Sequence, residues 1–195
     1  MPDLSAPAVL VHADESCLGN DASKPSPGGN AALLEARAGD SLARWDFYEC
    51  SPSTTNNRMA LAGAIATLEW IRRQWRRARV VYVSDSQYLI KGMNEWVAAW
   101  AARGWKRKGG AVENLALWQK LVEAAAAHDV RWEWVAGHAG HVKNEYANML
   151  AIRAAERQQR SNGLVPSGFD AWLADQRARG RYLTADPDRE VLERL

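Results

Sequence analysis

Two aspartates occupy positions where acidic side chains commonly do chemistry, each directly after an apolar stretch of the chain. Asp14 follows Ala8–Ala13 (AVLVHA), and Asp85 follows Val80–Ser84 (VVYVS). Both stretches are typical of buried strands, and open α/β sheets bind their ligands at the ends of such strands. Two carboxylates from neighbouring strand ends can share a hard cation such as Mg²⁺. The alternative is that each aspartate only caps the following segment, which for Asp85 is a helix.

The elements that must position these aspartates follow from apolar periodicity and turn residues. Strands are expected at Ala8–Ala13, Asn30–Ala36, Ala43–Cys50, Val80–Ser84 and Val130–Val135, and helices at Asn57–Trp75, Ser86–Val97, Asn114–His128 and Val142–Gln159. Asn56 or Asn57 is the expected N-cap of the first helix. Three successive strands followed by helix-linked strands predict an α/β fold with a five-stranded mixed sheet flanked by helices.

The end of the chain differs in composition from the rest. Arg160–Ser167 (RSNGLVPS) reads as a linker, followed by short amphipathic helices at Gly168–Arg181 and Pro187–Leu195. We therefore expect a domain at residues 1–159 and a C-terminal helical extension at residues 160–195. Phe169, Trp172 and Leu173 form an apolar stripe. This stripe is expected to dock on the domain itself and not on a partner.

Composition and charge indicate the broad class of protein. The 195 residues carry a formal net charge of +2, so overall charge does not predict a polyanion partner. No signal peptide or membrane span is expected. Cys17 and Cys50 cannot form a disulfide framework, which favours a reducing cytoplasm. A cytoplasmic monomer without membrane contact is therefore expected.

Five motifs occur in a fixed order along the chain. They are DESCLGN (14–20), TTNNRM (54–59), SDSQY (84–88), ENLALW (113–118) and GHAGHVKNE (137–145). Together they resemble the type 1 ribonuclease H family, over roughly residues 8–158. The resemblance implies a ribonuclease H-like fold and an endoribonuclease that hydrolyses the RNA strand of RNA–DNA hybrids with Mg²⁺ or Mn²⁺, leaving a 5′-phosphate on the RNA.

The resemblance also implies roles for single residues. Asp14 resembles the family's first aspartate, which bridges two metal ions, and Asp85 resembles the second. His138 resembles the mobile histidine that assists proton transfer or product release. The residues that resemble readers of RNA 2′-hydroxyls and minor-groove edges are Asn20, Asn56, Asn57 and Gln87, and Thr55 resembles a DNA-phosphate contact.

A basic, tryptophan-rich segment resembles the protrusion of this family. It comprises Trp96, Trp100, Arg103, Trp105, Lys106, Arg107 and Lys108. The resemblance implies that its aromatics hold the protrusion together while its cations grip the DNA strand. Asn114, in the fourth motif, is assigned to the same nucleic-acid surface. A solvated charged face is the alternative for the cations.

Three positions depart from the family pattern. Ala60 occupies the place of a metal-binding glutamate, and Asn148 that of the last aspartate. An asparagine oxygen can still ligate Mg²⁺, whereas alanine cannot. Glu15 replaces a glycine after Asp14, so we hypothesise that Glu15 supplies the missing ligand. Since neighbouring strand residues point to opposite faces, Glu15 is expected to reach the metals only if the strand ends or bulges there, or if the loop at 21–27 repositions it.

These departures leave three interpretations open. The chain is a metal-dependent nuclease with an atypical site, in which Mn²⁺ substitutes for Mg²⁺ or is preferred. Alternatively, it is a weakened or inactive relative that binds hybrids, or Ala60 or Asn148 was introduced by engineering. The H-x-x-H spacing of His138 and His141 does not predict zinc, because neither cysteine completes a zinc pattern.

Overall fold

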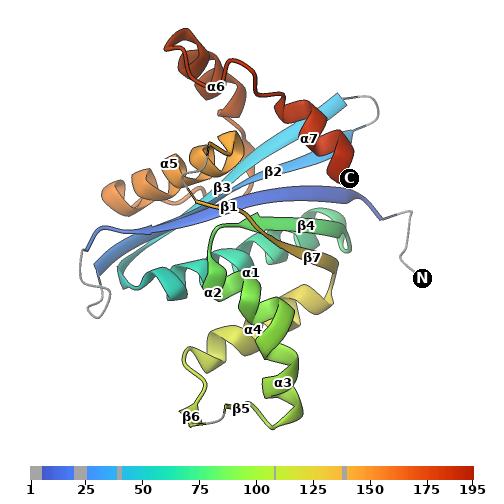
Figure 1. Cartoon of the computed structure of the whole chain (residues 1–195), viewed down its shortest axis with the longest axis vertical. Coiled ribbons are helices and arrows are strands. Elements are labelled where there is room, and N and C mark those ends of the chain that lie inside the picture. Colours follow the sequence, from blue (N-terminus) through green and yellow to red (C-terminus); the bar gives the residue numbers. More distant parts are fainter. Residues whose placement is uncertain (1–5, 20–25, 39–40, 108, 138–139) are drawn as a thin grey trace.

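A mixed six-stranded sheet forms the centre of the protein (Figure 1), in the order β7-β4-β1-β2-β3-β8. The computed structural model describes residues 6–19, 26–38, 41–107, 109–137 and 140–195. The strands are β1 (Ala8–Cys17), β2 (Ser26–Ala38), β3 (Ser41–Thr54), β4 (Arg79–Ser84), β7 (Asp129–Trp134) and β8 (Val165–Pro166). β1, β2 and β3 form the expected antiparallel meander, and β4 and β7 extend it in parallel.

The expected count of five strands is wrong by one. Val165 and Pro166, inside the expected linker, pair with Asp46 and Trp45 at the edge of β3. A proline cannot donate to a strand ladder and is tolerated at a sheet edge. The C-terminal extension therefore begins as part of the main sheet.

Helices cover both faces of the sheet. They are α1 (Asn56–Trp75), α2 (Gln87–Lys91), α3 (Val97–Ala102), α4 (Leu115–Ala126), α5 (Val142–Arg157), α6 (Phe169–Ala178) and α7 (Pro187–Arg194). A π-helical stretch, η1 (Gly92–Trp96), joins α2 to α3, and β5 (Lys106–Arg107) pairs with β6 (Gly110–Ala111) in a separate hairpin. In Figure 1, α1 and α4 lie on one side of the sheet and α5, α6 and α7 on the other. In the described part of the chain, no helix has the length and apolar character needed to cross a membrane.

The start of α1 differs from the expected cap. Thr55, and not Asn56 or Asn57, is the N-cap, and its hydroxyl accepts a hydrogen bond from the Arg58 amide at 3.4 Å. Thr55 has extended backbone angles, which is the usual conformation of an N-cap. Asn56 and Asn57 are consequently the first residues of the helix.

The side-chain alternation of β1 divides its residues between the two faces. Val9, Val11 and Ala13 belong to the core shared with α1 and α4. Leu10 belongs to a cluster on the opposite face, where it packs with Val191 of α7. Since a strand has a period of two, Asp14 continues the face of Leu10, and Glu15 continues the face of Ala13.

The C-terminal extension packs on the sheet face that α5 leaves open. Phe169 and Leu173 of α6 are buried with Tyr146 and Leu150 of α5, and Val191 of α7 is fully buried. The expectation that the apolar stripe docks on the domain itself is therefore confirmed.

A hydrogen bond and ion pairs also hold α7 on the domain. Glu190 is hydrogen-bonded to His12 of β1 at 3.0 Å, where burial lowers the pKa of His12, and it pairs with Lys143 of α5 at 3.5 Å. The Lys143 ammonium lies 2.6 Å from Glu35 of β2, and both side chains are almost completely buried. Arg44 joins Glu35 at 2.8 Å and also pairs with Asp170 of α6 and Asp188 of α7. Buried charges need such partners, because an unpaired one is strongly destabilising.

Candidate active site

Asp14 and Asp85 lie side by side because of the register of their strands. β1 and β4 run parallel and pair up to Ala13 and Ser84, so the next residue of each strand is an aspartate at the same edge of the sheet. The two carboxylates are close enough that the charge of Asp85 raises the pKa of Asp14.

The Asp14 carboxylate is buried and held by two hydrogen bonds. Its Oδ2 accepts from the Asn144 side-chain amide at 3.1 Å, and its Oδ1 accepts from the Glu15 backbone amide at 2.7 Å. Burial, and then the charges of Asp85, Glu15 and Glu145, raise the pKa of Asp14 to about 8. Sequence reasoning missed Asn144, although its place one helical turn before Asn148 was a usable signal.

Glu15 points to the other face of β1, toward α1. It lines a small cavity together with Ala60, Met59 and Gly63. Burial, and then the charge of Asp85, raise the pKa of Glu15 to about 8, although a hydrogen bond with the Ser86 side chain opposes the shift. The carboxylate is therefore close enough to Asp85 to be affected by its charge, and Glu15 and Ala60 border the same cavity.

Two of the three conditions named for Glu15, a strand end and a bulge, are not met, and the third, the loop at 21–27, lies mostly outside the described residues. β1 neither ends nor bulges at Glu15, which pairs regularly with Asn30 of β2 while the strand continues to Cys17. Instead β4 ends at Ser84, so that Asp85 lies beyond the last paired residues. Asp85 can thus be approached from both faces of β1, by Asp14 on one side and by Glu15 on the other.

Contacts from β7 and from the segment that follows β7 hold Asp85 in position. The Trp134 indole donates to the Asp85 carbonyl at 3.0 Å. Gly137 packs directly against the Asp85 carboxylate, where a Cβ atom would collide with it. Any larger residue at this glycine would therefore displace the carboxylate.

Asn148 lies on α5, half-buried beside the acidic cluster. It lines a cavity of about 380 Å³ together with Glu145 and Trp172. Among the described residues, Asn144 and not Asn148 is hydrogen-bonded to Asp14. His138 lies outside the described residues, so its assigned role stays a prediction.

The donor chemistry of this cluster fits a hard cation. Asp14, Glu15 and Asp85 bring three carboxylates together, and the pKa values of Asp14 and Glu15 are raised first by burial and then by the charge of Asp85. Within the described ranges, however, no three His, Cys, Asp or Glu side chains already enclose one metal position. Mg²⁺ commonly uses only one or two carboxylates and completes its shell with water and phosphate oxygens.

Several of the residues expected to bind nucleic acid lie at the beginnings of helices α1 and α2. Asn56 and Gln87 are exposed at the first turns of α1 and α2, and Asn57 is half-buried. Thr55, which resembles a DNA-phosphate contact, uses its hydroxyl as the helix cap. Asn20 and Lys108 lie outside the described residues.

The aromatic part of the expected protrusion forms a packed cluster. The ring centroids of Trp96 and Trp100 lie 5.7 Å apart. The Tyr88 ring lies 6.0 Å from that of Trp96, and the Trp118 ring lies 5.7 Å from that of Trp100. Asn114 donates to the Tyr88 hydroxyl at 3.3 Å, so it supports the cluster. Trp105 packs against the main core. The cations Arg103, Lys106 and Arg107 are exposed.

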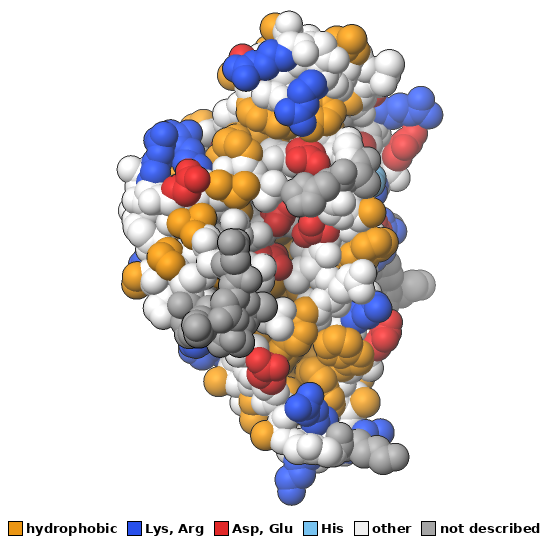
Figure 2. Space-filling model, turned by 60° about the vertical axis from the view of Figure 1, so that its left-hand side comes forward, with side chains coloured by type: hydrophobic (Ala, Val, Ile, Leu, Met, Phe, Trp, Pro, Cys, Tyr) orange, Lys and Arg blue, Asp and Glu red, His pale blue; other side chains and the backbone are white. Residues whose placement is uncertain are grey.

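One face of the molecule therefore has an acidic centre between basic ends. Figure 2 shows acidic side chains in the middle of this face, with Lys and Arg side chains at the lower end and over the C-terminal helices at the top. A long anionic ligand crossing this face would meet cations on both sides of the acidic centre.

Comparisons with known proteins show which proteins this chain is similar to. The RNase H family model matches residues 6–156. A ribonuclease H of Methylococcus capsulatus is 43% identical over 157 residues, covering 80% of this chain and 94% of that protein. A ribonuclease H of Aromatoleum aromaticum is 44% identical over 158 residues, covering 80% and 96%. The solved structure of LC9-RNase H1, described as a type 1 RNase H with the type 2 active-site motif, is 51% identical with a TM-score of 0.83, covering 88% of this chain and 83% of that one.

Proposed function

The chain belongs to the ribonuclease H family, whose enzymes hydrolyse the RNA strand of RNA–DNA hybrids, and we propose that it does so at a rebuilt acidic site. In this site Glu15 replaces the carboxylate that is absent at Ala60. Asp14, Asp85, Glu15 and Asn148 are the proposed ligands of divalent metal ions, on which this family generally depends.

The position of Glu15 carries this proposal. Glu15 lines the same cavity as Ala60, and the charge of Asp85 contributes to the raised pKa of the Glu15 carboxylate. A carboxylate on β1 therefore reaches the region that a glutamate on α1 would otherwise serve. The description of LC9-RNase H1 as a type 1 enzyme with the type 2 motif supports the view that this fold tolerates a rearranged acidic motif.

The chain's own residues have distinct tasks in this mechanism. Bound divalent cations supply activation of the attacking water and stabilisation of the leaving oxygen. Asn144 fixes the orientation of Asp14, and Trp134 holds the backbone of Asp85. Asn148 offers an uncharged oxygen, and His138 serves the proton or product step. Mg²⁺ is the proposed ion, and Mn²⁺ is expected to substitute well because it binds such ligands more tightly.

Substrate recognition is proposed to use both ends of the face described above. Asn20, Asn56, Asn57 and Gln87 contact the RNA strand near the acidic centre, where 2′-hydroxyls distinguish RNA from DNA. The protrusion carries Arg103, Lys106, Arg107 and Lys108 to the phosphates of the DNA strand.

Replacing Glu15 by glutamine tests the proposal. Cleavage of a blunt RNA–DNA hybrid in Mg²⁺ and in Mn²⁺ should fall by ~100-fold or more, as expected for loss of a group that holds the metal. Asp14→Asn is the inactive reference, and Glu123→Gln, on the exposed surface of α4, is the matched control. A Glu15→Gln enzyme that cleaves at the wild-type rate would reject the role of Glu15.

A second function is favoured by the loss of acids at two positions. Ala60 and Asn148 lower the negative charge of the site, which suits a relative that binds hybrids without cutting them. Nanomolar hybrid binding with no cleavage in either metal ion would select this alternative.

A further inference from the structure

A groove between α5 and the C-terminal extension leads away from the acidic cluster. We propose that this groove binds a single-stranded extension of the RNA strand, beyond the duplex that is cut. The proposal rests on the proposed function, because it takes the substrate strand to lie at Asn148.

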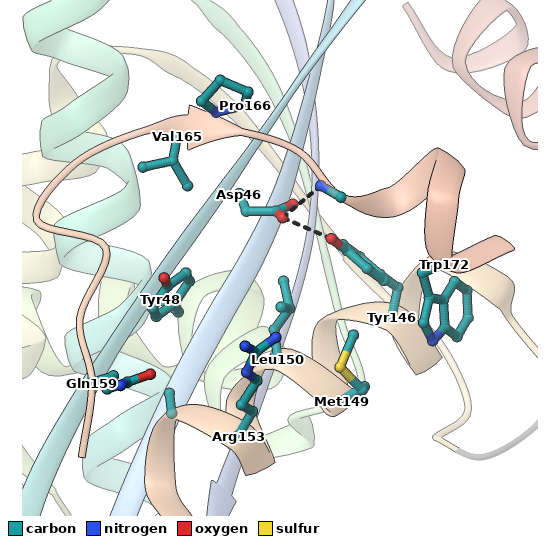
Figure 3. A pocket seen from close by; sticks show the side chains of 12 residues that line it. Asp46, Tyr48, Tyr146, Met149, Leu150, Arg153, Gln159, Val165, Pro166 and Trp172 are labelled. Atoms are coloured by element: carbon teal, nitrogen blue, oxygen red, sulfur yellow. Dashed lines mark hydrogen bonds between the residues drawn. The ribbon is translucent and has the colours of Figure 1, made fainter. Parts of the chain in front are cut away.

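Two adjoining cavities form the groove. The first, of about 430 Å³, lies between α5 and the segment around β8, as Figure 3 shows. The second, of about 380 Å³, lies between α5 and α6 with the residues that follow α6, and it includes Asn148. Met149, Arg153 and Trp172 line both cavities, so the two cavities lie next to each other along α5.

Aromatic rings line the path. Trp172 is half-buried, and its ring centroid lies 5.2 Å from that of Tyr146 and 5.8 Å from that of Tyr182. Tyr48 lines the first cavity on the strand side (Figure 3). Aromatic side chains along a groove provide stacking surfaces for unpaired bases, because every base has an aromatic face.

Cations lie where phosphates would pass. Arg153 is exposed at the junction of the cavities and forms no ion pair with the described residues. Arg181 lies over the Tyr182 ring at 5.0 Å in the second cavity. Glu145 and Glu156 also line that cavity, so phosphates are expected at the two arginines and not along the whole path.

The first cavity is better suited to a base than to a fixed charge. Asp46, the acid in its wall, accepts hydrogen bonds from the Tyr146 hydroxyl at 2.7 Å and from the Gly168 amide at 3.1 Å. The exposed polar group opposite Arg153 is the Gln159 amide, which can hydrogen-bond a base edge. A duplex is too wide for such a cavity, whereas a splayed single strand can enter it.

Binding by hybrids with and without an RNA overhang tests the inference. Fluorescence anisotropy, with Ca²⁺ as the divalent ion, would compare a blunt hybrid with hybrids that carry an overhang at either RNA end. The wild-type protein should bind one overhang hybrid about fivefold or more tightly than the blunt one. Arg153→Gln should remove this gain, and Arg157→Gln, one turn along α5 and outside both cavities, should keep it.

A photocrosslink avoids any dependence on the folding of variants. A 4-thiouridine in the overhang should crosslink to peptides that contain Trp172, Tyr182 or Tyr48. Equal affinity for blunt and overhang hybrids, or crosslinks confined to other segments, would overturn the groove assignment. Blunt-hybrid cleavage would then still support the proposed function, whereas absence of binding to every hybrid would overturn both proposals.

Discussion

At the scale of single residues, the candidate site depends on the face of β1 from which each acidic side chain projects. The pairing of Asp14 with Asp85 could be predicted from sequence, because both directly follow apolar stretches that were expected to be neighbouring strands. The placement of Glu15 could not, because the expected strand ended at Ala13, whereas β1 continues through Glu15 to Cys17. Alternation alone sends Asp14 and Glu15 apart, and only the strand lengths reveal that Asp85 is accessible to both.

The cavity shared by Glu15 and Ala60 predicts the effect of restoring a glutamate at position 60. Ala60 is only 4% exposed, so Ala60→Glu places a second carboxylate beside Glu15. The free energy of unfolding should fall by about 1–3 kcal/mol, as for an uncompensated buried polar group. Combining Ala60→Glu with Glu15→Gly should recover stability and hybrid cleavage. Denaturant unfolding measures the stability of both variants, and equal stability of the single and double variants would contradict the expected recovery.

The raised pKa values of Asp14 and Glu15 predict how stability varies with pH in metal-free protein. Their ordinary values of 3.8 and 4.5 rise to about 8 on folding, so the folded state holds these protons more tightly than the unfolded state. Their contribution to stability is complete below about pH 4 and is lost as pH rises toward 8. Unfolding in EDTA should show a weaker decline over this window for Asp14→Asn/Glu15→Gln than for wild type. An identical decline in both proteins would reject the assignment.

At the scale of elements, the long strands and helices follow from periodicity, and the exceptions have local causes. Asn57–Trp75 is predicted almost to the residue, because its apolar stripe is long and regular. The helix expected at Ser86–Val97 is instead interrupted by the π-helical stretch η1, where Gly92 packs against the Trp118 ring. β8 has two residues and depends entirely on β3, so no local pattern could predict it.

The anchoring of α7 predicts a stabilising role for Glu190. Burial alone would raise its pKa, but the hydrogen bond and charge of His12, together with Lys143 and Arg194, lower the pKa from 4.5 to about 2. The stabilisation is present above about pH 4.5 and is lost as pH falls toward 2. Because burial lowers the pKa of His12, His12 acts mainly as a neutral hydrogen-bond partner at neutral pH. Glu190→Gln should therefore lower the free energy of unfolding by about 1–3 kcal/mol at neutral pH, as for loss of a charged hydrogen-bond acceptor.

Glu193 provides a control on the same helix. It pairs with Arg189 on the exposed surface at 2.7 Å, where ion pairs contribute little. Thermal unfolding at pH 7 and pH 3 should separate Glu190→Gln from Glu193→Gln. If the two variants melt alike at pH 7, α7 is not held by its buried carboxylate.

At the scale of the whole molecule, the extension is part of the folded body although the family model ends at residue 156. The motifs of residues 14–145 indicate the catalytic fold, but they carry no information about what covers the second face of the sheet. That cover depends on contacts between distant residues, such as Val191 with Leu10. The amphipathic pattern indicated only that the extension would dock, not where.

Truncation after Arg160 tests this integration. The shortened chain would expose the sheet and α5 surfaces now covered by Phe169, Leu173 and Val191. Burial of three such side chains contributes about 5 kcal/mol, so the melting temperature should fall by roughly 10 °C or more. A truncated protein that melts with the full chain would instead make the extension dispensable for stability.

The hydrogen bond between His12 and Glu190 joins residues that are 178 positions apart in the chain. Because β1 is synthesised before α7, His12 and Lys143 lack Glu190 while the residues between them are translated. The catalytic motifs of residues 14–145 are therefore all synthesised before the contact that secures α7 over the sheet can form.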